Sequence, residues 1–286
     1  MFLGNLLNAN KNVTFYNSNS DTVPVFYNIW RELLCERIMN LFTWNSDVSE
    51  KEIEQRLLLT GTCGIAYYKD SLTAFYGNFY GVTKYYDEYT HYIVNSPVYS
   101  KELEIGKEIA VIDNNKLRNS ITPLIHMYAT LLAHNDVTMI HTLVNGRETG
   151  GTPVAGTQKV SESIKQYRSS LKKGIFNPII DGAFLNAKFI DSHRTNQVLI
   201  KDLAETRKNL MSDFYNAIGV RTAWSKKGNM IVEEVTGNDS MVLFNINDML
   251  ESRKKGCEKI NKLFNVNWTV EKNKELIYRE DDSYNE

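Results

Sequence analysis

Apolar residues recur every three or four positions over several long stretches of the chain, which is the pattern of amphipathic helices. The first stretch runs from Pro24 to Trp44 and reads PVFYNIWRELLCERIMNLFTW. A shorter helix is predicted after it, because Ser49 and Glu52 have the spacing of a capping box and Gly61 is placed to end the helix.

Residues 62 to 112 follow a different pattern: β-branched and aromatic residues dominate and glycines punctuate the segment, which predicts short strands joined by turns. Eleven Tyr or Phe lie between Tyr67 and Tyr99. They could stack on the bases of single-stranded nucleic acid. We favour packing within the sheet and between subunits, because strands select aromatic residues and only two lysines, Lys69 and Lys84, lie among these rings.

Helical periodicity returns in the second half of the chain. Thr122 and Pro123 have the sequence of an N-cap and first helical position, and a further long helix is predicted from 196 to 218, ending at Gly219. Asn247 is placed to cap a last helix, DMLESRKKGCEKINKLF, which precedes a strand, NVNWTV, and an acidic tail that we expect to be partly disordered.

A small α/β segment is predicted between the two long helices. It contains a short helix from Val160 to Lys173 and one or two strands around turns at Asn177-Pro178 and Asp181-Gly182. The order of elements predicts an α+β fold in which two long helices form an antiparallel pair that presents this insertion at its tip.

The composition limits the possible functions of the protein but does not identify one. The chain has 286 residues, 42% of them hydrophobic, and its 33 Lys and Arg nearly balance 34 Asp and Glu. Any contact with nucleic acid must therefore be local. The three cysteines show no CxxC pair or zinc-type spacing, which predicts free thiols in a reducing compartment. We expect a soluble protein, since no stretch has the pattern of a secretion signal or a membrane span.

Candidate chemistry is sparse. His126, His134 and His141 fall on the polar side of the helix that begins at Thr122, without the further ligands that a metal site needs, so we expect them to face solvent or another subunit. Gly151 and Gly156 have the spacing of a phosphate loop, but Thr157 and Gln158 follow where Lys and Ser or Thr are required. The sequence predicts no catalytic residue, no metal and no cofactor.

Several segments together resemble the upper collar protein of small short-tailed phages, the portal or head-tail connector of the group with protein-primed linear DNA genomes. In chain order these are LFTW, GIAYYKD, SPVYSKE, the Thr-Pro start of the helix at 122, RKNLMSDFYNAIGV, IVEEVTGND and SRKKGCEKINKLFNVNWTV. The likeness runs from residue 24 to 272, and its most specific part is SRKKGCEKINKLF.

The resemblance implies a ring of twelve subunits at one capsid vertex, through whose axial hole double-stranded DNA is packaged and ejected. It implies a portal-type subunit with N-terminal helices and a β-rich wing, a first stem helix, a clip, a second stem helix, a channel loop, and a last wing helix with strand and tail. The expected bounds of these parts are 1–116, 117–145, 146–195, 196–221, 222–245 and 246–286.

The resemblance also implies partners: the major capsid protein, the packaging ATPase and the lower collar or tail protein, with a place in the virion after assembly in the host cytoplasm. Some relatives begin with a cluster of Arg and Lys associated with a packaging RNA. Here Lys11 is the only basic residue among the first 30, which argues against an RNA partner.

The resemblance makes two groups of basic residues candidate binding sites. Non-specific contact with DNA in the channel is predicted for Lys201, Arg207, Lys208, Lys226 and Lys227. A ring repeats each lysine as a belt of charge, so each contact can be weak. The second group is Lys165, Arg168, Lys172 and Lys173. These residues either dock the motor or the lower collar, or form a solvated helix face.

Two other functions compete with a portal. A nuclease or packaging ATPase is disfavoured, because the chain has no Walker A loop and Glu233 and Glu234 lack the His or Lys partners that metal-assisted hydrolysis needs. Another collar or tail structural protein would share a ring but would not need the two-helix stem and channel loop.

Overall fold

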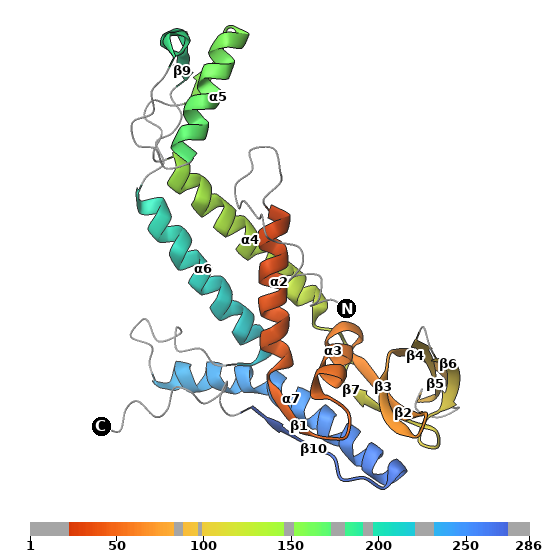
Figure 1. Cartoon of the computed structure of the whole chain (residues 1–286). Helices are drawn as coiled ribbons and strands as arrows, with labels where there is room; N and C mark the ends of the chain where they lie inside the picture. The colour runs from red at the N-terminus through yellow and green to blue at the C-terminus, as the bar shows by residue number, and fades with distance from the viewer. Residues whose placement is uncertain are drawn as a thin grey trace. The chain divides into compact units, whose positions relative to one another are not determined.

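A computed structural model shows an α+β chain, as predicted (Figure 1). The residues that it describes are 23–82, 88–96, 99–145, 152–172, 181–190, 197–220 and 232–273. The chain divides into two compact units, one of residues 1–27 and 131–209 and the other of residues 28–130 and 210–286. Three helices contribute residues to both units: α2 (Val23–Met39), α4 (Thr122–Asn145) and α6 (Gln197–Ile218).

The bounds of α4 and α6 confirm the two long helices predicted from the sequence, and Gly219 takes a positive φ of 82° at the end of α6. The end of α2 corrects the prediction. The helix stops at Met39, and Phe42–Asn45 form strand β1, which pairs antiparallel with β10 (Thr269–Lys272). This pairing joins residues far apart in the sequence and buries Phe42 and Trp44 on one face, so it overrides the local helical period.

Helix α3 (Glu50–Thr60) ends as predicted: Gly61 has φ +79° and donates its N–H to the Leu57 carbonyl. A carbonyl oxygen of Arg118 would lie 2.1 Å from a Cβ at position 61, so both the backbone angle and the space require glycine. The predicted capping box does not form, because the Ser49 side chain makes no capping hydrogen bond.

The β region forms two small antiparallel sheets in the unit of residues 28–130 and 210–286. One has the order β3-β2-β7 and the other the order β4-β5-β6. Their bounds are β2 (Thr62–Tyr68), β3 (Ser71–Phe75), β4 (Gly77–Val82), β5 (Tyr89–Ser96), β6 (Tyr99–Glu104) and β7 (Ile109–Asp113). The prediction of short strands over residues 62 to 112 is therefore confirmed.

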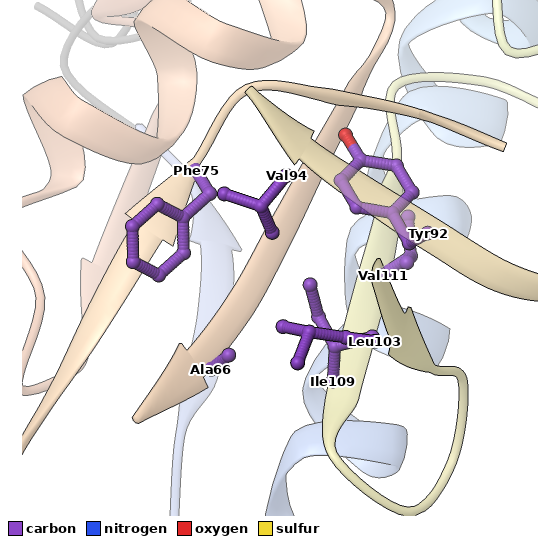
Figure 2. Packing of buried hydrophobic residues seen from close by; sticks show 7 residues of the cluster. All are labelled: Ala66, Phe75, Tyr92, Val94, Leu103, Ile109 and Val111. Carbon is purple, nitrogen blue, oxygen red and sulfur yellow. The ribbon is translucent and has the colours of Figure 1, made fainter. Parts of the chain in front are cut away.

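A shared apolar core joins the two sheets (Figure 2). Tyr92 lies within it, fully buried, and its hydroxyl is 3.3 Å from the Thr62 hydroxyl. The ring approaches Gly64 and Gly77 so closely that a Cβ at either position would lie under 3.0 Å from its Cε1. Figure 2 shows side chains from strands of both sheets: Ala66, Phe75, Tyr92, Val94, Leu103, Ile109 and Val111.

Helix α7 (Val232–Phe264) is longer than predicted. The resemblance implies a channel loop over residues 222–245 and the sequence predicts a helix capped by Asn247, yet residues 232–245 are helical and Asn247 lies inside α7. Buried Ile246 and Met249 continue the apolar stripe of the last helix toward its N-terminus. Gly237 costs the helix only about 1 kcal/mol, and each of Asn238, Asn245 and Asn247 costs less.

Close packing fixes α7 against β7. A Cβ at Gly256 would lie 2.9 Å from two side-chain carbons of Ile112, which is fully buried. Glycine at this position lets the helix approach the strand at a distance that alanine would not allow without movement.

The other unit contains the predicted α/β segment. Helix α5 (Gln158–Lys172) confirms the predicted helix, and β8 (Thr152–Val154) pairs antiparallel with β9 (Lys188–Ile190). Strand β9 lies in the stretch for which the sequence predicted one or two strands, and Gly182–Asn186 of the same stretch form the 3-10 helix η1. The Tyr167 and Phe184 rings pack η1 on α5 with centroids 4.8 Å apart. The predicted Asn177-Pro178 turn lies outside the described residues.

Candidate functional site

The basic residues predicted on the second stem helix all lie on the exposed part of α6. Lys201 and Lys208 are exposed and seven residues apart, so they lie on nearly the same face of the helix. Neither forms an ion pair with another described residue. Both side chains are therefore available to a phosphate group.

Arg207 differs from its two neighbours. Its Nη1 lies 3.6 Å from Oδ1 of Asp136 on α4, and the Asp136 side chain is largely buried. The ion pair links α4 and α6, so Arg207 is committed in part to the protein. It remains 45% exposed, however, and can still contribute charge to the surface of the helix. The sequence pattern could not reveal this pair, because the two residues lie on helices separated by the whole inserted segment.

Acidic side chains share the exposed surface of α6. Asp202 and Glu205 are exposed between the cations. The helix therefore carries a mixed field rather than a uniformly basic one, and any attraction for DNA is weak for each subunit.

The two lysines of the predicted channel loop, Lys226 and Lys227, lie outside the described residues. The part of that loop that the structure describes, from Val232 onward, is helix α7. In the sequence, Lys226 and Lys227 therefore come shortly before the N-terminus of helix α7.

The predicted docking residues lie on α5, whose buried side is formed by Val160, Ser163 and Ile164. Lys165 is exposed and Arg168 is half-buried. Their helical positions place them on one stripe with Lys172, the last residue of α5, whereas Lys173 lies outside the described residues. The stripe is compatible with docking and equally with a solvated face.

The aromatic residues of the β region mostly pack on one another, as predicted. Phe75 and Tyr99 have ring centroids 5.3 Å apart, and Tyr68 contacts both rings. Phe79 stacks on Tyr89 at 4.8 Å. Base stacking would need exposed rings among cations, whereas these rings are largely engaged with one another. Tyr85 and Tyr86 lie outside the described residues.

The described residues offer no metal site and no membrane-spanning helix. His126, His134 and His141 are exposed on α4, and no group of three or more His, Cys, Asp or Glu could hold a metal among the described residues. No described helix is both long enough and apolar enough to cross a bilayer. The three cysteines are free, and burial raises the pKa of the Cys63 thiol to about 12 and that of Cys257 to about 11.

Known structures provide distant likenesses. A chain of the structure of the portal and tail of native bacteriophage P68 is 15% identical, with 90% of this chain and 93% of that chain covered and a TM-score of 0.48. An HK97 family phage portal protein from Corynebacterium diphtheriae is 10% identical, covers 88% and 92%, and has a TM-score of 0.45. A chain of the native gene transfer agent virion is 9% identical, covers 97% and 91%, and scores 0.44. At such scores and identities these likenesses decide nothing by themselves.

The family comparison is decisive. The model of the family described as Phage Connector (GP10) matches residues 10–277, far more than half of the chain. This match agrees with the resemblance carried by the sequence segments and selects a connector over another collar or tail structural protein. The chain therefore belongs to the phage connector family: it is a portal protein, the virion component that forms the head-tail connector.

Proposed function

We propose that this connector assembles into a ring, of twelve subunits by its sequence resemblance, at one capsid vertex and that double-stranded DNA passes through the ring during packaging and ejection. The observation that carries the proposal is the pair of exposed cations on one face of α6, Lys201 and Lys208, which form no ion pair with another described residue, in a chain of the connector family.

Weak contacts suit a conduit. Each neutralised phosphate adds affinity that depends on salt, and a channel that held its cargo tightly would stall it. A ring repeats Lys201 and Lys208 once per subunit, so two residues become two belts of positive charge. The acidic Asp202 and Glu205 on the same helix keep the net attraction low. Arg207 contributes less, because Asp136 already neutralises part of its charge.

Two further sets of contacts belong to the proposal. Lys226 and Lys227, just before α7, would add a second basic region toward the DNA. Lys165, Arg168, Lys172 and Lys173 would dock the packaging ATPase and later the lower collar or tail protein, while the β-rich wing would meet the major capsid protein. No chemical step is assigned to the chain: the motor supplies the work, and the connector guides and retains the DNA.

The sequence resemblance supports the finer details of the proposal. It supports an origin in small short-tailed phages that have protein-primed linear genomes, and we propose that the ring assembles in the host cytoplasm.

Negative-stain images of the purified protein test the ring directly. We expect closed rings with a central hole wide enough for a duplex, and monomers or solid particles would overturn the proposal. A second measurement compares the DNA that wild-type particles and particles with Lys201→Ala and Lys208→Ala protect from nuclease. Equal protection at all salt concentrations would remove these lysines from the DNA path.

A further inference from the structure

The ion pair between Arg207 on α6 and Asp136 on α4 is loose, although one of its partners is well shielded from water. Both residues belong to the compact unit of residues 1–27 and 131–209. The Arg207 Nη1 lies 3.6 Å from Oδ1 of Asp136, which is longer than a hydrogen bond. The Asp136 side chain is 13% exposed, whereas that of Arg207 is 45% exposed. The guanidinium can therefore leave this carboxylate for an anion in solution.

A second arginine–carboxylate pair shows the geometry of a structural contact in this chain. Arg253 and Glu54 meet through two contacts of 2.8 Å, and both side chains are 1% exposed. Such a pair cannot separate without leaving a desolvated charge behind. A pair with an exposed partner, such as Arg207 with Asp136, contributes little to stability, because water can solvate that partner. The Arg207 pair thus has the geometry of an exchangeable contact and not of a brace between helices.

The position of Arg207 on α6 gives the exchange a second partner. Arg207 lies about 100° around the helix from Lys208, on the side that approaches α4, and both residues are exposed. A guanidinium presents five N–H donors in a plane, which matches the geometry of a phosphate group. A phosphate that contacts Lys208 therefore competes with Asp136 for the same arginine.

The surroundings of Asp136 decide how this competition ends. A carboxylate that is largely shielded from water attracts a cation more strongly than an exposed carboxylate does, because less solvent screens its charge. Asp136 is also fixed on a helix, so it rebinds Arg207 whenever no phosphate is near. DNA has to move past each contact in a channel, and an arginine that stayed on its phosphate would add salt-dependent affinity and hold the duplex.

We propose that Asp136 is a positioning residue for DNA passage: it competes with the passing phosphate for Arg207 and rebinds the arginine after each contact, so that the basic surface around Lys208 releases the duplex. Asp136 acts through Arg207 and does not itself contact DNA. The inference rests on the α6 channel of the proposed function and adds to it a residue of α4.

Asp136→Asn tests the competition, because it removes the charge and keeps nearly the same shape. We expect rings of this variant to bind a short duplex about threefold or more tightly than wild-type rings at roughly 0.1 M salt. The slope of log affinity against log salt should become steeper, since each released Arg207 neutralises a further phosphate. Asp136→Glu keeps the charge and should restore binding toward the wild-type value. Fluorescence anisotropy measures both quantities.

Two comparisons separate the exchange from a change in net charge. Glu162→Gln on α5 removes one exposed carboxylate from the same unit, and its rings should bind DNA as wild-type rings do. In an Arg207→Ala background, Asp136→Asn should leave DNA binding unchanged, because no arginine remains to be released. Particles with Asp136→Asn rings should also eject their DNA more slowly than wild-type particles.

The possible results distinguish this inference from the proposed function. Equal binding by Asp136→Asn and wild-type rings, while Lys208→Ala weakens binding, would overturn the inference alone. An effect of Asp136→Asn that persists without Arg207 would overturn it as well. If Asp136→Asn rings do not assemble, Arg207→Ala decides: an unchanged salt slope would show that Arg207 is a fixed brace, and a shallower slope that it reaches the phosphate. No change in DNA binding with Lys201→Ala, Lys208→Ala or Arg207→Ala would instead refute the proposed DNA path along α6.

Discussion

Arg253 on α7 and Glu54 on α3 form a two-pronged ion pair in the interior of the protein. The Arg253 Nε donates to Oε1 and the Nη2 donates to Oε2 of Glu54, both at 2.8 Å, and each side chain is only 1% exposed. The indole N–H of Trp44 also donates to Glu54, and Arg253 donates further to the carbonyl and side-chain oxygens of Asn114. One residue thus ties together α7, α3, β1 and the segment after β7.

Replacement of Arg253 by Met should destabilise the protein strongly. The Glu54 carboxylate would remain buried with only the Trp44 hydrogen bond, and removal of one partner of a buried pair costs about 3–5 kcal/mol. Urea unfolding measures the loss. A second substitution, Glu54→Gln, should restore part of it, because no net charge would then be buried without a partner.

Lys255→Met on the same helix is the control. Lys255 lies 2.8 Å from Glu251, but this pair is exposed to water, so its loss should leave the unfolding midpoint unchanged. An Arg253 variant as stable as the Lys255 variant would show that the buried network does not stabilise the fold.

Gly256→Ala should lower stability although alanine favours helices. The added Cβ would lie 2.9 Å from Ile112, and overpacking of a core costs about 1–3 kcal/mol. The gain in helix propensity, about 1 kcal/mol, offsets only part of that cost. The double variant with Ile112→Ala should be more stable than the sum of the two single losses predicts, because the smaller residue leaves room for the Cβ. Strict additivity in thermal unfolding would contradict the close contact of α7 with β7.

Ionisation of Tyr92 should contribute to a loss of stability in alkaline solution. Burial raises the pKa of this phenol to about 12, above its ordinary value of 10. Between these pH values the unfolded chain loses a proton that the folded chain keeps, so the free energy of unfolding decreases as the pH rises from 10 to 12, by roughly 3 kcal/mol at most. The contribution is fully present below pH 10.

The comparison of Tyr92→Phe with wild type isolates this effect. We expect the free energy of unfolding to decrease less with pH in the variant than in the wild type. The variant also loses the hydrogen bond to Thr62, which costs about 1 kcal/mol at pH 8. Cys63, whose pKa is also raised to about 12, contributes equally to both proteins. Tyr80→Phe, on an exposed residue, should follow the wild-type curve, and identical curves for all three would refute the role of Tyr92.

DNA binding should depend on salt through α6. Lys201→Ala and Lys208→Ala should each reduce the slope of log affinity against log salt, because each removes phosphate contacts from the ring. Arg207→Ala should reduce it less, since Asp136 already takes part of that charge. Fluorescence anisotropy with a short duplex measures the slopes. Lys51→Ala on α3 is the control, and a slope change as large for Lys51 as for Lys208 would refute a specific role of α6.

The sequence by itself determined the long helices and the β region. Thr122 and Pro123 mark the start of α4 and Gly219 the end of α6, because these signals act within one or two turns of the chain. It also determined the family, through segments such as SRKKGCEKINKLF that the family model then matched over residues 10–277. The exposure of Lys201 and Lys208 followed from the helical period alone.

Only the tertiary structure decided where local signals were overruled. Phe42 and Trp44 leave the helical pattern because β10, from the other end of the chain, supplies hydrogen bonds and burial. Helix α7 begins at Val232, inside the expected loop, and Asn247 does not cap it because buried Ile246 and Met249 continue the packed stripe past that residue. Arg207 and Arg253 look alike in the sequence, yet one is half exposed and the other is buried among its partners. Those differences depend on which distant groups meet each side chain, and the free energy of such contacts exceeds the local preferences that a sequence pattern records.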